Sequence, residues 1–270
     1  MDFRTITFYM YEPNDKNLFC QHLDKVINSK EAPFKSLNNS NADIRELKKS
    51  GGIYTGFLAN LRLTNLPHLA KIHDLSEREL PKDDDEALVE KSHFLYSETT
   101  GFLFFQMNGK GFRNPTNLAE ILTERFNETV ALNQKLTGEQ EAKLNDKQDS
   151  IHKIEINIAN ISPSLLGDSS IEEAIVASAK VAQKIKLILS YDKRSGGILD
   201  MSILKLWKKL KPQEPTRFIA HSTELDEPID LLLDRVKFTK RVEIIDGYIV
   251  SQSAYQKLNE CRIEFSASHE

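Results

Sequence analysis

The sequence predicts an α+β fold with mixed or antiparallel sheets and flanking helices, in two domains of which the second is a smaller α+β unit. Two observations support this prediction. Runs of β-branched and aromatic residues, bounded by turn residues, are interspersed with segments whose apolar residues recur at helical spacing. The chain has 270 residues, 40% of them hydrophobic, which is enough to bury the core of two domains or of one large one.

The first elements are predicted as a strand, a helix and a second strand. Residues 5–11 are β-branched and aromatic and favour a strand, which ends at Pro13. Residues 18–27 carry apolar side chains at the spacing of one helical face. Residues 54–63 favour another strand.

A β-hairpin is the clearest local pattern. Residues 87–97 and 102–108 are strand-like runs, and the short turn 98–101 that joins them closes with a glycine. Asn114-Pro-Thr-Asn117 then has the composition of a helix start, before a predicted helix at 118–126.

A polar interval predicts the boundary between the domains, because residues 138–150 carry almost no apolar side chains. We therefore expect an N-terminal α+β domain at 1–137, a polar hinge at 138–150 and a smaller α+β domain at 151–240. The remaining residues, 241–270, are expected to form a helical segment that packs on the first domain.

The second part of the chain has an α+β rhythm. Apolar and polar residues alternate over 151–161, which is typical of a half-buried strand. Further strands are predicted at Lys184–Ser190, 217–223 and 235–244, and helices at 174–182, 201–210 and 250–265.

Charge is segregated along the chain. The protein has a net charge of -4, yet residues 180–211 hold nine Lys or Arg and two acidic residues. The rest of 151–270 is correspondingly acidic, so this segment is a positive patch within a negative chain. Polyanion binding is the commonest reason for such a patch.

The patch is predicted to spread over a strand, a turn and one helix face, where it would neutralise phosphates without reading sequence. The candidate nucleic-acid contacts are Lys184, Lys186, Lys193, Arg194, Lys205, Lys208, Lys209 and Lys211. The alternative is a solvated helix face and turn without a ligand. Trp207, the only tryptophan, is expected to anchor the helix in the core rather than to stack on a base.

No pattern in the sequence predicts catalysis, a metal or a cofactor. Cys20 and Cys261 form no CxxC pair, and the seven histidines fit no metal-binding spacing. The glycine-containing loop 108–113 lacks P-loop spacing, and the acidic run 83–86 lacks EF-hand spacing. We therefore expect a non-enzymatic protein without catalytic residues, metal or cofactor. The absence of an apolar signal core and of an apolar run long enough to span a bilayer favours the cytoplasm.

The order of elements resembles the Rex-type phage exclusion proteins. Three segments carry this resemblance together with the strand at 151–161 and the basic unit after it. They are Phe8-Tyr-Met-Tyr11, the hairpin Ser92-His-Phe-Leu-Tyr-Ser with Thr100-Gly-Phe-Leu-Phe-Phe, and Phe112-Arg-Asn-Pro-Thr-Asn-Leu-Ala-Glu-Ile-Leu122. The resemblance covers most of the chain. It implies a cytoplasmic homodimer that binds double-stranded DNA without sequence preference and acts from a prophage against superinfecting phage.

The expected function is therefore sequence-nonspecific nucleic-acid binding in phage exclusion. One alternative is a protein-interaction module that binds an acidic phage or host partner, such as a single-stranded-DNA-binding protein. A second is an unrecognised nuclease or toxin whose catalytic residues are dispersed in the sequence. A membrane effector partner is a further expectation, without insertion of this chain into a bilayer.

Overall fold

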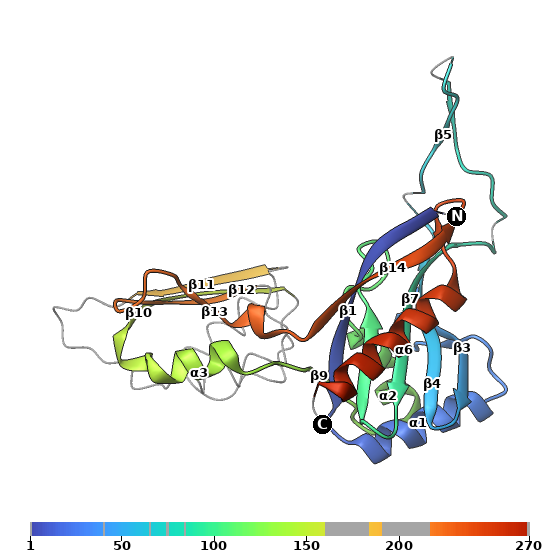
Figure 1. The fold of residues 1–270 in the computed structure, drawn as a ribbon. Helices are drawn as coiled ribbons and strands as arrows, with labels where there is room; N and C mark the ends of the chain where they lie inside the picture. The colour runs from blue at the N-terminus through green and yellow to red at the C-terminus, as the bar shows by residue number, and fades with distance from the viewer. Residues whose placement is uncertain are drawn as a thin grey trace. The chain divides into compact units, whose positions relative to one another are not determined.

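The chain forms two compact units. The computed structural model describes residues 2–39, 41–64, 66–73, 76–83, 85–159, 184–190 and 217–268 (Figure 1). Unit 1 consists of Met1–Asn133 and Lys237–Glu270, and unit 2 consists of Gln134–Val236. Helices and antiparallel sheets occur in the same chain, so the predicted α+β class is confirmed. None of the helices in the described ranges is both long and apolar enough to cross a bilayer.

A nine-stranded sheet forms the centre of unit 1. Its order is β15-β14-β1-β8-β7-β4-β3-β2, with β9 also paired to β1. Each neighbouring pair along this order is antiparallel. The strands are β1 (Asp2–Pro13), β2 (Phe34–Lys35), β3 (Ala42–Ser50), β4 (Ile53–Arg62), β7 (Leu88–Ser97), β8 (Phe102–Gln106), β9 (Leu132–Gln134), β14 (Lys237–Ile245) and β15 (Tyr248–Ile249). Strands from both ends of the chain pair at β1 and β14, which joins the two segments of unit 1.

Helices cover both faces of this sheet. Helices α1 (Lys16–Asn28) and α2 (Thr116–Phe126) pack with the aromatic residues Phe94 and Tyr96 of β7 in one buried cluster. Helix α6 (Ser251–Ala267) contacts the neighbouring residue His93 instead. Because successive strand residues point to opposite faces, α6 lies on the other face of the sheet.

The predicted helix at 18–27 and the predicted hairpin are confirmed. The Asp15 carboxylate accepts a hydrogen bond from the Leu18 backbone N–H at 2.9 Å, which fixes the start of α1. In the hairpin of β7 and β8, Gly101 has a φ of 70° and donates its N–H to the Ser97 carbonyl at 2.8 Å. A glycine is favoured there because other residues rarely adopt positive φ.

Strand β3 was not predicted, because six of its nine residues are exposed or half-exposed and the segment is strongly charged. The structure pairs it with β4 through a tight turn at Gly51 and Gly52, both with positive φ. This glycine pair was the available sequence signal, since Gly-Gly is a frequent two-residue hairpin turn. A bulge after Arg45 leaves Glu46 with a φ of 52°.

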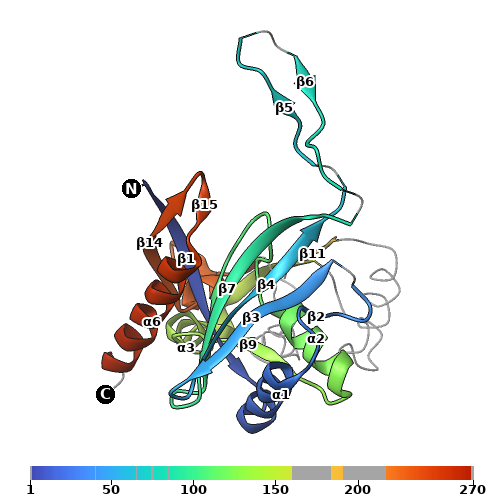
Figure 2. The same cartoon turned by 90° about the vertical axis from the view of Figure 1, so that its right-hand side faces the viewer.

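A two-stranded arm joins β4 to β7. It contains β5 (Leu69–Ala70) and β6 (Glu77–Arg78), and it extends away from the sheet of unit 1 in both views (Figures 1 and 2). The arm contributes little to the core, because Ile72 at its end is 89% exposed.

Unit 2 contains a four-stranded antiparallel sheet with a helix on one face. The strand order is β11-β10-β12-β13. The elements are α3 (Glu139–Asp146), η1 (Gln148–Ser150), β10 (Ile151–Ala159), β11 (Lys184–Ser190), β12 (Arg217–Ser222), β13 (Ile229–Asp230) and η5 (Leu231–Asp234). Leu144 of α3 is buried against Ile154, Ile156 and Phe218, so the helix covers the apolar face of the sheet. The strands predicted at 151–161, Lys184–Ser190 and 217–223 are all present.

The interval expected to be a hinge, residues 138–150, instead contains helix α3 and is part of unit 2. The reason is a helix cap that is distant in sequence. The buried carboxylate of Asp234 accepts hydrogen bonds from the backbone N–H groups of Gln140 at 2.9 Å and Glu141 at 3.1 Å. It also accepts a hydrogen bond from the Thr137 hydroxyl at 3.0 Å. A negative charge at the N-terminal end of a helix interacts favourably with the positive end of the helix dipole. The carboxylate also accepts hydrogen bonds from N–H groups that have no partner within the helix.

Replacing Asp234 by alanine is expected to destabilise unit 2 by about 2 kcal/mol, because several buried hydrogen-bond donors lose their acceptor. The free energy of unfolding is measured by urea denaturation, followed by far-ultraviolet circular dichroism. The control is Asp226→Ala at an exposed position, which should leave the curve unchanged. Equal curves for Asp234→Ala and the native protein would contradict the assigned cap.

The compact units also differ from the expected domains near the C-terminus. Residues 237–240, expected in the second domain, begin strand β14, which pairs with β1 in unit 1. The expected helical segment 241–270 starts with the rest of this strand. Its helix, α6, buries Ala254, Leu258 and Cys261 in unit 1.

Candidate nucleic-acid interface

One face of the unit 2 sheet carries basic side chains. Lys153 of β10 lies opposite His221 of β12, and Asn157 lies opposite both Arg217 of β12 and Lys186 of β11. Residues that are directly opposite in a sheet point to the same face. The basic residues therefore share the face that is turned away from the buried cluster around Leu144.

Of the two candidate residues on β11, Lys186 fits this arrangement. Lys186 is exposed, whereas its neighbour Leu187 packs against the buried cluster, so the predicted alternation along this strand is present. Lys184 lies two positions before Lys186 in β11, and its backbone is in register with Ala159 of β10. The predicted residues Lys193, Arg194, Lys205, Lys208, Lys209 and Lys211, and also Trp207, lie outside the described residues.

Glu155 is the acidic residue at the centre of this face. Its carboxylate is 2.6 Å from the Lys153 ammonium, 3.0 Å from the Arg217 guanidinium and 3.3 Å from His221 Nε2. The hydrogen bond from Lys153, supported by Arg217, lowers the pKa of Glu155 to about 2. Glu155 is therefore ionised at neutral pH and holds the two cations side by side.

The charges on this face do not cancel. Lys153, Lys186 and Arg217 are cationic, whereas the described strands carry two carboxylates on this face, Glu155 and Asp230, which lies opposite Ile219. The fixed guanidinium and the ammonium groups supply the donors that phosphate oxygens accept. The arrangement can therefore bind a polyanion.

The sequence did not predict that Lys153, Arg217 and His221 belong to this face. The alternation of charged and apolar residues in β10 was a usable signal for Lys153, since it places Lys153 and Glu155 on the side opposite the isoleucines. Arg217 and His221 are more than 60 positions away along the chain, and only the pairing of β12 with β10 brings them to Glu155.

The sequence did not distinguish His93, a buried histidine of unit 1, from the other histidines. His93 Nδ1 is 2.6 Å from the Gln106 amide oxygen, which can only accept, so Nδ1 carries the hydrogen. Nε2 then accepts the Ser251 hydroxyl hydrogen bond at 2.9 Å. Burial lowers the pKa of His93 to about 4. The hydrogen bond to Gln106 favours the charged form, but burial outweighs it, so the ring is neutral at pH 7. We assign His93 a structural role joining β7, β8 and α6.

An ionic cluster in unit 1 is also structural. The Lys49 ammonium lies 2.7 Å from Glu98 and 3.3 Å from Asp24. The Tyr54 hydroxyl oxygen lies 2.9 Å from both carboxylates and donates its single hydrogen to one of them at a time. The hydrogen bonds from Lys49 and Tyr54 lower the pKa of Glu98, and Glu98 in turn raises the pKa of Lys49. These groups satisfy one another and connect α1 with β3, β4 and the turn that follows β7.

The two loops that the sequence singled out are held by local hydrogen bonds. In the acidic loop, Glu86 accepts a hydrogen bond from the Asp83 N–H at 2.9 Å, and Lys82 donates to the Glu86 carbonyl. Among the residues that the structure describes, no group of three or more His, Cys, Asp or Glu side chains is arranged to hold a metal ion. The loop after β8, with Asn108 and Lys110, lines a cavity that is considered below.

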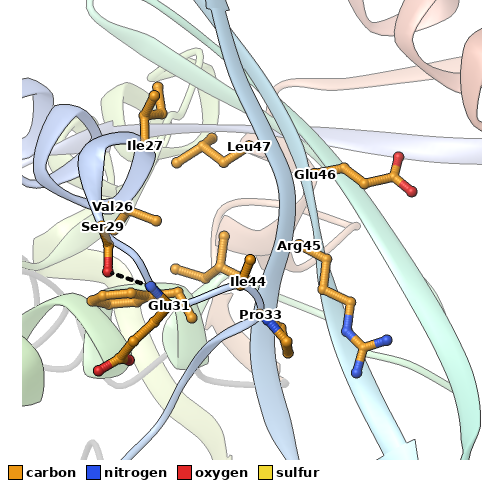
Figure 3. A pocket seen from close by; sticks show the side chains of 11 residues that line it. Val26, Ile27, Ser29, Glu31, Pro33, Ile44, Arg45, Glu46 and Leu47 are labelled. Carbon is orange, nitrogen blue, oxygen red and sulfur yellow. Dashed lines mark hydrogen bonds between the residues drawn. The ribbon is translucent and has the colours of Figure 1, made fainter.

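An apolar hollow of 340 Å³ lies between α1 and β3 (Figure 3). Val26, Ile44 and Leu47 face it, whereas Arg45 and Glu46 extend from the other side of the strand. The Arg45 guanidinium is instead held by the buried Asp43 carboxylate at 2.8 Å. Of the charged residues that line the hollow, Glu31 is paired with Arg125 and Arg45 with Asp43, and we do not assign the hollow a function.

None of the known protein-family models matches the sequence, and no curated protein matches it at a significant level. The fold and the face described above define an α+β protein of two compact units with a cationic sheet face in the second.

Proposed function

We propose that the protein is a non-enzymatic, sequence-nonspecific nucleic-acid-binding protein and that the cationic sheet face of unit 2 contacts the phosphate backbone. The observation that carries this proposal is the alignment of Lys153, Lys186 and Arg217 on one face of the sheet, in a chain with a net charge of -4. A segregated positive face is the electrostatic footprint of polyanion binding.

Phosphate neutralisation is the proposed mechanism. Arg217 supplies a planar guanidinium and Lys153 and Lys186 supply ammonium groups, which suit phosphate oxygens but do not read bases. The basic segment that continues after β11 adds further lysines and Arg194 to the same unit. Duplex DNA is the proposed ligand, and no cofactor, metal or chemical step is required.

The proposed biological role is phage exclusion from a prophage, by a cytoplasmic homodimer. This part of the proposal is supported by the resemblance of the aromatic N-terminal strand and the central hairpin to the Rex-type proteins. A membrane effector partner is proposed on the same basis.

Retention of duplex DNA by the full-length protein tests the proposal. We expect retention at low salt that falls steeply as salt is added, with a log–log slope of about -0.9 for each phosphate contacted. Duplexes of unrelated sequence should bind equally well. The absence of retention at low salt, or full retention by Lys153→Glu/Lys186→Glu/Arg217→Glu, would refute the proposal.

The exposed Ile188 favours a second candidate function, recognition of an acidic protein. This side chain is 46% exposed and lies opposite Glu155 on the cationic face, where an apolar group suits a protein surface better than a phosphate backbone. The acidic tail peptide of a single-stranded-DNA-binding protein is a suitable probe. If the peptide binds and Ile188→Ser weakens its binding without changing DNA retention, protein recognition becomes the preferred function.

A further inference from the structure

A cavity in unit 1 lies where the central strand β8 stops. This strand pairs with β7 only at Phe94–Ser97 and with β1 only at Phe8–Tyr11, so the remaining parts of both neighbours have no strand between them. Figure 2 shows β1 and β14 diverging from β7 and β4 toward this end. The cavity of 480 Å³ is lined there by β1, β7, the turn between β14 and β15, and the loop after β8.

Cations predominate in the lining. Arg4, Arg62, Lys91 and Lys110 face two carboxylates, Glu90 and Asp246. Arg62 is paired with Glu90 at 3.6 Å. Within the described residues, Arg4, Lys91 and Lys110 form no ion pair.

The three remaining cations are held in place by other contacts. Arg4 donates to the Gly247 carbonyl at 3.2 Å, and the Lys91 ammonium lies 4.5 Å above the Phe57 ring. The loop that carries Lys110 is fixed by Asn108, whose side chain donates to the Lys91 carbonyl at 2.9 Å and accepts the Lys110 N–H at 3.0 Å. Arg4, Lys91 and Lys110 therefore offer positive charge to a ligand without first breaking an ion pair.

An aromatic ring is available at the same cavity. Tyr248 lines it and is 74% exposed. Its backbone position is fixed, because Asp246 and Gly247 form a tight turn with positive φ and Tyr248 pairs with Ile245. Exposed aromatic side chains of this kind bind flat rings by stacking, and a cavity of this volume is in the range that small ligands occupy.

We propose that this cavity binds a nucleoside phosphate, with the phosphates contacted by Arg4, Lys91 and Lys110 and the base stacked on Tyr248. Anionic phosphates match the unpaired cations, and the flat base matches the exposed ring. The inference goes beyond the proposed function, because it concerns a small ligand and a different unit from the DNA-binding face.

Isothermal titration of the full-length protein with ATP, GTP and tripolyphosphate tests this proposal. We expect saturable binding of at least one nucleotide, and weaker binding of tripolyphosphate by about tenfold, since it lacks a base to stack. Lys91→Glu/Lys110→Glu should weaken both ligands by more than about tenfold. Tyr248→Ala should weaken only the nucleotide.

Matched controls separate this site from the cationic face of unit 2. Lys30→Glu/Lys35→Glu changes two exposed lysines elsewhere in unit 1 and should leave nucleotide binding unchanged. Lys91→Glu/Lys110→Glu should leave DNA retention unchanged. A failure of the nucleotide proposal is therefore distinguishable from a failure of the proposed DNA-binding function. The proposal is overturned if no nucleotide binds at millimolar concentration, or if bound nucleotide is insensitive to Lys91→Glu/Lys110→Glu.

Discussion

Replacing Lys153 and Arg217 together by glutamine is expected to weaken binding of duplex DNA by about 100-fold at low salt, because two charge-assisted contacts to phosphate are lost. Both side chains lie on the cationic face of unit 2, within 3.0 Å of the Glu155 carboxylate. Glutamine keeps most of the side-chain volume and the ability to donate a hydrogen bond, so the variant mainly removes charge. Fluorescence anisotropy of a labelled duplex measures the dissociation constant.

The salt dependence of this variant provides an independent readout. The log–log slope should become shallower by about 1.8, the value for two phosphate contacts. Lys30→Gln/Lys35→Gln, which removes two charges from exposed positions in unit 1, is the matched control and should change neither quantity. Loss of affinity with an unchanged slope would show that these residues do not contact phosphates.

Replacing Glu155 by glutamine, on the same face, is expected to have the opposite effect on DNA binding. The native carboxylate neutralises one of the two cations beside it at neutral pH, because its pKa is about 2. Removing that charge should strengthen DNA binding, by several-fold at low salt. Weaker DNA binding by Glu155→Gln would mean that the carboxylate is needed to position Lys153 and Arg217.

The free energy of unfolding of the native protein is expected to fall by about 3 kcal/mol when the pH is lowered from 7 to 4, because of His93 alone. The pKa of this histidine is about 4 in the folded chain and 6.5 in its ordinary state. Between these two values the unfolded chain binds more protons than the folded one, so stability is present above pH 6.5 and is lost as the pH falls toward 4. The physical cause is burial of the ring, which penalises its charged form.

A His93→Gln variant isolates this contribution from that of the carboxylates. It should be less stable than the native protein at pH 7, since it loses the hydrogen bonds to Gln106 and Ser251, and its stability should depend less on pH between 4 and 6.5. Urea denaturation at several pH values, followed by far-ultraviolet circular dichroism, measures both effects. His73→Gln at an exposed position is the control, and parallel pH curves for His93→Gln and the native protein would contradict the assignment.

Several elements were predictable because their information is local. The helical spacing of apolar residues identified α1 and α6, and the turn closed by Gly101 identified the hairpin of β7 and β8. The alternation in β10 predicted a half-buried strand, and the observed burial of Ile154 and Ile156 follows it. In each case the pattern spans only a few residues, so no distant partner is needed to read it.

Other elements depend on partners that are distant in the chain. Helix α3 has few apolar residues and begins where Asp234, more than 90 positions away, caps its N–H groups. The polar composition of 138–150 therefore indicated a hinge. The segment instead contains a helix, of which one residue, Leu144, is buried against the sheet. Strand β3 is charged and half-exposed, and its pairing with β4 decides its conformation.

For the candidate site, the sequence by itself determined the residue types and their alternation: basic residues concentrated in the second part of the chain, with Lys184 and Lys186 on one side of a strand. Only the tertiary structure decided that Lys153 and Arg217 share that face with Lys186 and that Glu155 lies between them. The same holds in unit 1, where the end of β8 and the turn at Gly247 bring Arg4, Lys91 and Tyr248 to one cavity. The physical reason is that alternation along a strand is a property of neighbouring residues, whereas register between strands depends on which residues meet when the whole sheet forms.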